Sequence, residues 1–531
     1  MGLIDGREPG IYWQSRMGNN EDGIGGNCHR YDVVTGGTDG KMAHASFVVD
    51  YGVKFGGKQS GYASEFTSPK GLFAKRGESE LEGGGKPPEA LILTHAHEDH
   101  LGAVRHAIDM GYQVPPVFAT AFTAQILQKS LRNAGIPKDQ RPPVTVVSAD
   151  RPITVAGATV EFVPVDHLPG AAALRIDSPD ATVLHTGDYK FDQTLTVGRG
   201  VDPAKFREIG AKGVDLLVAD STSVVEDAPK VSEEEIQANL TRVLADQKGR
   251  AVVAGVLGSQ LDRVVSLGRA AAQSGRVMIL TGRSLQDNVD SLTFTGADIN
   301  KLTGTTVLPA HQAETIPADK ALVVTTGAFG QPMAGLTRAA DRAPGALWID
   351  RETTVIIPQR SISPVRSSHA TMVHRLENLG ARVVTAENAE KLGYGPIHQS
   401  GHAIAADAKL LYSLVKPRHL IAPMHGGPSQ LEANAQLARG LGIEAVPYDH
   451  NGEILKVSHQ GVHPVGREPV DRIAAEATGE HKKVPRAGKG EGRRAGPVEL
   501  YRYDTLPGQM PPTEGRDVAA LARVASVAHG R

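Results

Sequence analysis

The chain has 531 residues, and its 57 basic and 59 acidic side chains leave a formal net charge of −2. An apolar content of 40% is sufficient for large buried cores and excludes a wholly disordered protein. The near-cancellation of charge excludes a globally basic surface, so any site for a polyanion must be local. The single cysteine, Cys28, excludes an internal disulfide and a cysteine-based zinc site.

Two further features bear on location and size. No apolar run reaches the roughly 18 residues that a membrane-spanning helix requires, and the N-terminus lacks a signal-peptide pattern. These features predict a cytoplasmic protein that does not associate with a membrane. At roughly 100–200 residues per domain, the length predicts roughly two to four domains.

The first 50 residues are rich in glycine and end in an apolar, strand-like run at 46–50. Residues 51–88 are polar and interrupted by Gly and Pro, which predicts a long loop or an insertion. From Ala90 onward, short β-rich runs alternate with helical patterns, as in parallel βαβ units. The expected strands lie at 90–94, 160–165, 182–186, 214–219, 251–256, 276–281, 321–326, 353–358, 382–386 and 419–424. The expected helices lie at about 232–247, 261–273, 369–379, 403–415 and 429–440.

The strongest indication of a functional site is the segment THAHEDHLGA. It places an H-x-H-x-D-H pattern directly after the strand expected at 90–94. In an extended segment alternate side chains point the same way, so His95 and His97 share one side. A turn after them brings Asp99 and His100 close by, which suits two metal ions a few ångströms apart. Imidazole and carboxylate ligands without thiolates suit zinc, manganese or similar divalent ions.

Two metal ions need more ligands than one loop supplies, and three further candidates each follow an expected strand: His167, Asp188 and His425. Each has a simpler explanation when taken singly, because a lone histidine is often structural and Asp188 can cap a turn. Taken together they favour a metal site, since α/β-type sheets build sites where strand ends meet at one edge. A carboxylate between two ions can bridge them.

These motifs resemble those of the metallo-β-lactamase superfamily, and more narrowly the β-CASP nucleases of the ribonuclease J family, over about residues 20–455. The matching segments are FVVDYG with Asp50, THAHEDHLGA, VDHLPG with His167, HTGDYKFD with Asp188, ADSTS with Asp220, IHQSGHA with His402 and PMHGG with His425. The resemblance implies an α/β fold, in which a metallo-β-lactamase αββα sandwich carries an inserted β-CASP α/β domain. It places the sandwich at 1–222 and 388–456, the inserted domain at 223–387 and a basic C-terminal extension at 457–531.

The resemblance also implies a cofactor, namely two divalent metal ions per chain, with zinc as the first candidate and manganese as the alternative. The ligands that it implies for one ion are His95, His97 and His167. Those that it implies for the other ion are Asp99, His100 and His425, with Asp188 as the bridge.

The catalytic residues that the resemblance implies are Asp99, Asp220 and His402. His402, tuned by Asp220, is the candidate that protonates the leaving 3′-oxygen. Asp50 is expected to orient the ligand loop from behind the metal ligands. For Asp220 alone, a role as a helix cap or turn residue in the sequence DSTS is the simpler alternative.

Residues of three further positions are candidates for binding phosphate. His398 and Ser400 resemble the pocket that holds a 5′-terminal phosphate in the ribonuclease J family. An imidazole and a hydroxyl beside a glycine that permits a tight backbone are also suited to binding a phosphate. Ser284, at the end of an expected strand, is a candidate contact for backbone phosphate. The alternatives are an ordinary turn before a helix for the first pair and a helix N-cap for Ser284.

The resemblance favours a metal-dependent ribonuclease in RNA processing and decay, acting as a 5′→3′ exonuclease that prefers 5′-monophosphate ends and also as an endonuclease. The expected partner is single-stranded RNA, and the expected assembly is a homodimer or homotetramer. The alternatives are a β-CASP DNA nuclease in repair and a catalytically silent RNA-binding scaffold. The extension beyond residue 456 departs from the family pattern, and its basic cluster at 482–494 is either an RNA-contacting tail or a solvated linker.

Overall fold

The computed structural model divides the chain into two compact units. Unit 1 comprises Met1–Phe191, Val201–Ala228 and Gly401–Pro507, and unit 2 comprises Asp192–Gly200, Pro229–Ser400 and Gly508–Arg531. The structure describes residues 8–18, 24–36, 41–55, 64–149, 151–194, 197–198, 200–226, 230–361, 365–448, 450–475, 481–484 and 500–501.

Unit 1 is a sandwich in which two large sheets of the described residues face each other. The first sheet contains β1 Gly10–Met17, β2 Cys28–Gly36, β3 Met42–Tyr51, β7 Leu91–Ile92, β9 Val117–Ala119, β10 Val144–Val146, β23 Glu453–Ser458 and β24 Gly461–Arg467, in the order β10-β9-β7-β3-β2-β1-β23-β24. The second contains β11 Ile153–Val155, β12 Ala158–Pro164, β13 Ala172–Asp177, β14 Thr182–His185, β15 Leu216–Asp220 and β22 Leu420–Met424, in that order.

A single hydrophobic core lies between these two sheets. Trp13 and Phe47 of the first sheet belong to the same buried cluster as Phe162 and Val218 of the second. This shared core follows from the alternation of side chains along each strand, which turns one face of each sheet inward.

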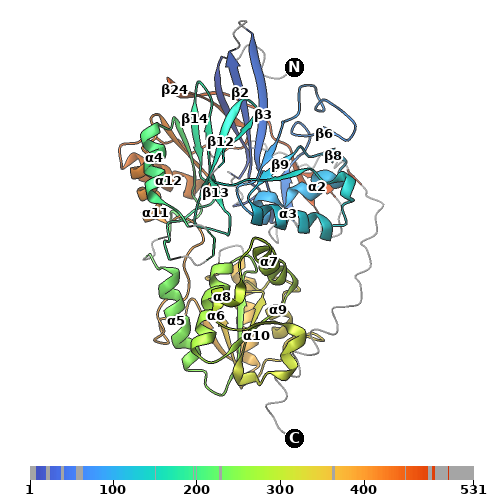
Figure 1. Ribbon diagram of the computed structural model, residues 1–531, viewed down its shortest axis with the longest axis vertical. Helices are drawn as coiled ribbons and strands as arrows, with labels where there is room; N and C mark the ends of the chain where they lie inside the picture. The colour runs from blue at the N-terminus through green and yellow to red at the C-terminus, as the bar shows by residue number, and fades with distance from the viewer. Residues whose placement is uncertain are drawn as a thin grey trace, which may run out of the picture. The chain divides into compact units, whose positions relative to one another are not determined.

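Helices cover the outer faces of the sandwich (Figure 1). Beside the second sheet lie α4 Pro203–Lys212, α11 Ala405–Val415 and α12 Pro428–Arg439, and on the side of the first lie α2 Ala103–Asp109 and α3 Ala121–Asn133. The short helix α1 Glu98–Leu101 contacts β3 of the first sheet. The sequence at the start of α4 explains why a helix begins there. The Asp202 carboxylate accepts a hydrogen bond from the Ala204 amide, and Pro203 occupies the first turn. The layers therefore run helix, sheet, sheet, helix, which confirms the expected αββα sandwich.

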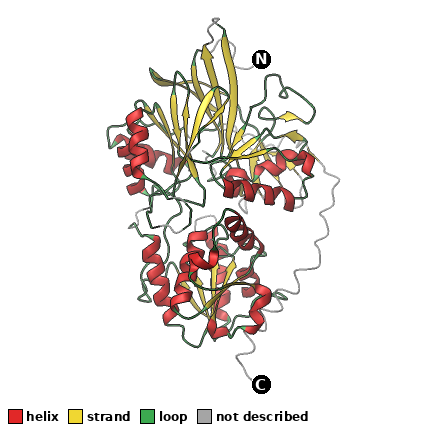
Figure 2. Cartoon of the chain, in the orientation of Figure 1, coloured by secondary structure: helices red, strands yellow, loops and turns green. Residues whose placement is uncertain are grey.

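Unit 2 is a parallel sheet with helices around it, as Figure 2 shows. Its strands, in the order β18-β17-β19-β16-β20-β21, are β16 Ala251–Val256, β17 Val277–Leu280, β18 Val307–Pro309, β19 Ala321–Thr326, β20 Thr353–Ile357 and β21 Arg382–Thr385. Every pairing in this order is parallel. The α-helices are α5 Glu233–Ala245, α6 Leu261–Gln273, α7 Arg283–Phe294, α8 Ile299–Thr303, α9 Gly335–Ala340 and α10 Arg366–Asn378. Apolar strands alternate with helices along this unit, as the sequence predicts for βαβ units.

Short strands lie in two segments, 51–88 and 457–531, for which the sequence predicts none. The stretch 51–88 contains β4 Lys54–Phe55, β5 Ser64–Thr67 and β6 Ala74–Lys75, the last paired with β8 Tyr112–Gln113. Within 457–531, β24 pairs with β23, and β25 Arg472–Ala475 pairs with β5. These strands are short, and most β24 residues are exposed, so neither segment carries an apolar run that signals a strand.

Beyond β25, the strands β26 His481–Val484 and β27 Leu500–Tyr501 complete a sheet with the order β27-β26-β25-β5-β4. Of the basic cluster at 482–494, Lys482 and Lys483 fall in β26, and its four other basic residues lie outside the described residues. In the part of the chain that the structure describes, no helix is long and apolar enough to span a bilayer.

Replacing Phe162 by Ala tests the shared core. Phe162 is 1% exposed in β12, so its removal leaves a cavity between the sheets. We expect the free energy of unfolding of unit 1 to fall by about 3–5 kcal/mol. Urea denaturation followed by circular dichroism measures it. The matched control is Val146→Ala on the exposed strand β10, which should change the value by less than about 0.5 kcal/mol.

Candidate metal centre

The candidate ligands gather at one edge of unit 1. Strands β14, β15 and β22 are parallel neighbours, so the residues that follow them emerge at the same edge of the second sheet. Asp188 follows β14, Asp220 ends β15 and His425 follows β22. His167 follows β12 of the same sheet. His95 and His97 come from the first sheet, where they lie between β7 and α1. Residues that are far apart in the sequence thus supply one site.

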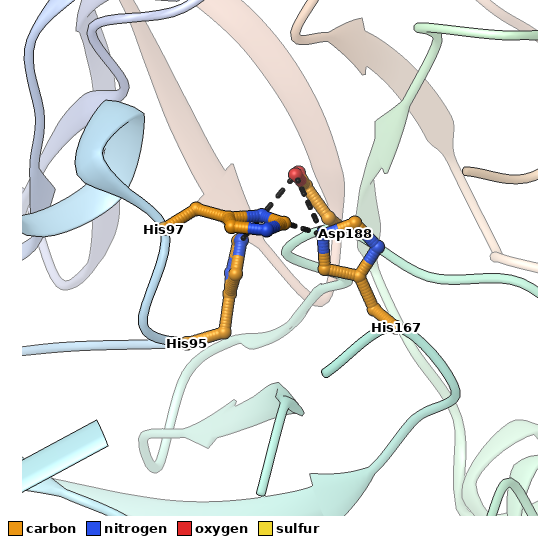
Figure 3. A group of neighbouring side chains, drawn as sticks. All are labelled: His95, His97, His167 and Asp188. Carbon is orange, nitrogen blue, oxygen red and sulfur yellow. Dashed lines mark hydrogen bonds and ion pairs between the residues drawn. The ribbon is translucent and has the colours of Figure 1, made fainter. Parts of the chain in front are cut away.

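One cluster consists of His95, His97, His167 and Asp188 (Figure 3). The His97 Nδ1 atom lies 3.2 Å from His95 Nε2 and 2.9 Å from His167 Nε2. The Asp188 Oδ2 atom lies 3.5 Å from the Nε2 atoms of both His95 and His167. Ligands arranged tetrahedrally around zinc at about 2.0–2.1 Å are about 3.3 Å from one another. The spacing of these atoms therefore fits a small divalent cation.

A second cluster consists of Asp99, His100, Asp188 and His425. His425 Nε2 lies 3.2 Å from Asp99 Oδ2, and His425 Nδ1 lies 2.9 Å from Asp188 Oδ1. His100 Nε2 lies 3.2 Å from Asp188 Oδ2. Asp188 is thus common to both clusters, which is the position that a bridging carboxylate requires.

Asp50 lies behind the second cluster and orients His100. Its Oδ2 atom lies 2.7 Å from His100 Nδ1, and Thr94 donates to both carboxylate oxygens from its amide and hydroxyl at 2.8 and 2.7 Å. Because His100 Nδ1 carries the proton in this hydrogen bond, the lone pair of neutral His100 lies on Nε2, which faces the cluster.

The chemistry of the donor set favours a cation between these groups. Both carboxylate oxygens of Asp188 are buried, and neither accepts a hydrogen bond of regular geometry from the described residues. Burial lowers the pKa of His97 to about 4, so its imidazole is neutral and has a lone pair available. Burial also disfavours a charge on His100, but Asp188, Asp50 and Asp99 outweigh it and raise the His100 pKa to about 10. His97 therefore offers a lone pair near neutral pH, whereas His100 offers one only after it loses a proton, and the carboxylates around His100 attract positive charge.

Asp220 and His402 form an adjoining pair. Asp220 Oδ2 lies 3.0 Å from His402 Nδ1, and Thr222 donates to Asp220 Oδ1 from its amide and hydroxyl. Burial raises the pKa of Asp220, but His402 outweighs this and lowers it to about 2, so Asp220 is ionised. Burial opposes protonation of His402, yet Asp220 and Asp188 raise its pKa. A third group, Asp188, Asp220, His402 and His425, is close enough to hold an ion as well.

The loop that carries His402 is tied to the first cluster. His167 Nδ1 lies 2.6 Å from the carbonyl oxygen of Gly401, so His167 donates to this loop and turns its Nε2 lone pair toward His97. The same hydrogen bond therefore orients a candidate ligand and positions the residue next to His402.

The candidate phosphate residues His398, Ser400 and Ser284 lie in unit 2, whereas all the clustered residues lie in unit 1. Ser284 is in the first turn of α7 and packs closely against Gly258. A Cβ atom added to Gly258 would lie only 2.9 Å from the Ser284 hydroxyl. His398 and Ser400 are partly buried and flank Gln399.

Asn27 is a site residue that the sequence analysis missed. Its Nδ2 atom lies 2.9 Å from His100 Nε2, and its backbone amide donates to the Asp99 carbonyl oxygen at 2.8 Å. Gly52 packs against the same carbonyl, since a Cβ atom there would lie 1.7 Å from it. An asparagine in a glycine-rich segment carries no signal of such a contact, because the contact joins residues that are distant in the sequence.

Comparisons with known proteins agree with this architecture. Residues 66–203 match the metallo-beta-lactamase superfamily, 248–376 match the ribonuclease J beta-CASP domain, and 396–447 match the Zn-dependent metallo-hydrolase RNA specificity domain. Ribonuclease J of Sinorhizobium meliloti is 32% identical over 430 residues, which cover 79% of this chain and 73% of that protein. The chain belongs to the ribonuclease J family.

Further relatives support the assignment to the ribonuclease J family. Ribonuclease J of Mycolicibacterium smegmatis is 32% identical over 78% of this chain and 75% of that protein. Ribonuclease J of Mycobacterium tuberculosis is 32% identical over 74% of this chain and 69% of its own length. A crystal structure of a protein of unknown function from Enterococcus faecalis has a TM-score of 0.57 at 19% identity and covers 84% of this chain and 100% of that one, which supports the fold alone.

Replacing Asp188 by Asn tests the shared carboxylate. An amide cannot supply two anionic oxygens to two clusters, so we expect the variant to retain only a small fraction of the wild-type metal after dialysis. Mass spectrometry of the metal content measures this. The control is Asp215→Asn, which alters another buried carboxylate of unit 1 that belongs to none of the clusters and accepts from the Thr182 amide at 2.8 Å. Undiminished metal in the Asp188 variant would contradict the assignment.

Replacing Asn27 by Ala tests its contact with His100. We expect the affinity of the second cluster for a divalent ion to fall about 10–100-fold, because Asn27 Nδ2 also donates to the Asp99 carbonyl oxygen at 3.3 Å and so helps to hold the segment that carries Asp99 and His100. Competition with a chromogenic chelator measures the affinity. The control is Asn388→Ala, since Asn388 donates to the Val383 carbonyl at 3.1 Å in unit 2. An affinity equal to that of the wild type would show that Asn27 only packs there.

Proposed function

We propose that this protein is a metal-dependent ribonuclease of RNA processing, which hydrolyses phosphodiester bonds at the centre built around Asp188. The observation that carries this proposal is the pair of His/Asp clusters that share Asp188 beside the Asp220–His402 pair. The match of residues 396–447 to an RNA specificity domain favours RNA over DNA.

The proposed cofactor is a pair of divalent ions, zinc in the first place and manganese as the alternative, because these ligands include no thiolate. One ion is assigned to His95, His97 and His167. The other is assigned to Asp99, His100 and His425, and Asp188 is assigned to both. Ions bound there supply Lewis acidity, which makes a water molecule nucleophilic at neutral pH and offsets the negative charge of the phosphate.

The residues of the chain have separable roles in this mechanism. Asp50 holds His100 with its Nε2 lone pair toward the cluster. Asp220 accepts from His402 Nδ1, so His402 is left with Nε2 as the atom that can carry a proton to the leaving 3′-oxygen. The raised pKa of His402 keeps a proton available for this transfer. Asp50, His100 and Asp220 are buried, which keeps their hydrogen bonds away from bulk water.

For substrate selection we propose single-stranded RNA with a 5′-monophosphate end, degraded 5′→3′, together with internal cleavage. His398 and Ser400 are the proposed contacts of the terminal phosphate, and Ser284 is the proposed contact of a backbone phosphate, since its hydroxyl lies at the start of a helix. A homodimer or homotetramer and a cytoplasmic location complete the proposal.

The test uses the purified full chain with Zn²⁺ or Mn²⁺ and one labelled oligoribonucleotide that carries a 5′-monophosphate, a 5′-hydroxyl or a 5′-triphosphate, beside the matched DNA. We expect mononucleotides to be released fastest from the 5′-monophosphate RNA, because a 5′-hydroxyl lacks the phosphate that His398 and Ser400 would bind and a 5′-triphosphate is larger than the single phosphate proposed for them. Gel electrophoresis resolves mononucleotides from internal fragments. The double variant Asp99→Ala, His100→Ala is the blank.

The other outcomes separate the alternatives. Faster cleavage of DNA than of RNA would favour a repair nuclease. Cleavage of neither, despite stoichiometric metal, would sink the proposal and favour a binding role. Equal rates on all three 5′ ends would leave a ribonuclease but remove the terminal-phosphate assignment.

A further inference from the structure

A buried ion pair in unit 2 lies outside every residue assigned above. Glu233 and Arg263 are 2% and 0% exposed, and the Arg263 guanidinium donates to both Glu233 oxygens at 2.8 and 3.1 Å. Ser266 donates to the same carboxylate at 2.8 Å. Burial of two charges costs free energy that only well-satisfied hydrogen bonds offset. The contribution of such a pair to stability is therefore small, and its contacts indicate its role better.

The guanidinium nitrogen that does not contact Glu233, Nη1, reaches the segment that carries His398 and Ser400. Arg263 Nη1 donates to the carbonyl oxygen of Ile397 at 2.8 Å and also contacts the carbonyl oxygen of Pro358. The backbone is therefore held by a buried charge at the residue immediately before His398.

The residue immediately after His398 is held by the same network. Gln399 Nε2 donates to Asp192 Oδ2 at 2.6 Å and to Glu233 Oε2 at 3.2 Å. Asp192 is itself fixed, because its Oδ2 accepts from the Glu233 amide at 3.0 Å and its Oδ1 accepts from Thr194. Hydrogen bonds to charged groups are about twice as strong as neutral ones.

His398 thus lies between two neighbours that are each tied to charged, buried groups, and Ser400 follows directly. A site that must recognise a phosphate needs its donors held within about half an ångström of the productive geometry, which packing and supporting hydrogen bonds provide. Loops held in this way lose less conformational entropy when a ligand binds.

We propose that Gln399, together with Asp192, Glu233 and Arg263, forms a set of positioning residues that determines how strongly the enzyme prefers a 5′-phosphorylated RNA end. The set acts by holding His398 and Ser400, and it does not touch the substrate. This inference rests on the proposed function of those two residues.

The experiment compares two substitutions of Gln399. Gln399→Met keeps the size of the side chain and removes the donor, whereas Gln399→Lys supplies a donor to the same two carboxylates. We expect Met to lower the ratio of kcat/KM for 5′-monophosphate RNA to that for 5′-hydroxyl RNA about tenfold, with cleavage of the 5′-hydroxyl RNA unchanged. We expect Lys to retain most of the ratio. The matched control is Gln247→Met, a buried glutamine of unit 2 that donates to the Val243 carbonyl.

A binding measurement keeps the test independent of turnover. The double variant Asp99→Ala, His100→Ala, with and without Gln399→Met, is titrated with the two oligoribonucleotides, and the Met variant should lose the difference in Kd between them. Equal losses on both substrates, or equal effects of Met and Lys, would overturn the inference and show a structural role. A wild-type chain that cleaves RNA without regard to the 5′ end would overturn this inference together with the terminal-phosphate assignment but would leave a ribonuclease, whereas a chain that does not cleave RNA would overturn the proposed function itself.

Discussion

The centre depends on one buried carboxylate that its surroundings do not satisfy. Asp188 is 1% exposed, and the groups around it are mainly imidazole nitrogens that approach it from two sides. A buried carboxylate without matching positive charge is strongly unfavourable in a protein interior. The negative charge of Asp188 is therefore neutralised either by protons on neighbouring histidines or by divalent cations. The lone pairs of neutral His95 and His97 favour divalent cations.

The fold serves this demand by bringing loops from both sheets to one edge and by holding them there. Asp50 and His425 adopt left-handed backbone conformations, with φ values of 58° and 55°, which non-glycine residues rarely adopt. Strain of this kind persists where surrounding contacts determine the conformation, and here Thr94, His100 and Asp99 supply those contacts. The close approach of Gly52 to the Asp99 carbonyl belongs to the same arrangement.

Unit 2 uses buried charge in another way. The Arg263–Glu233 pair has its own hydrogen bonds satisfied and extends them to the segment around His398. In unit 1 the charge of the carboxylates suits a bound cation, whereas in unit 2 the charge of Glu233 is balanced by Arg263. The difference follows from the residues supplied, since an arginine reaches a carboxylate with a fixed fork of donors and a histidine does not.

The sequence by itself determined the chemistry and the local elements. The strands expected at 251–256 and 321–326 coincide with β16 and β19, because these apolar runs are too short for a typical helix and are rich in β-branched residues. The residues of the H-x-H-x-D-H motif, with His167, Asp188 and His425, could be named because each follows a strand and has a side chain suited to metals. Their roles stay predictions until metal binding is measured.

Only the tertiary structure decided which of these side chains meet and what supports them. The pairing of β25 with β5, the contact of Asn27 with His100 and the link from Arg263 to Ile397 join residues far apart in the chain. None of them leaves a periodic pattern, since a contact of this kind depends on how loops close in space, and that is set by the packing of whole sheets and helices.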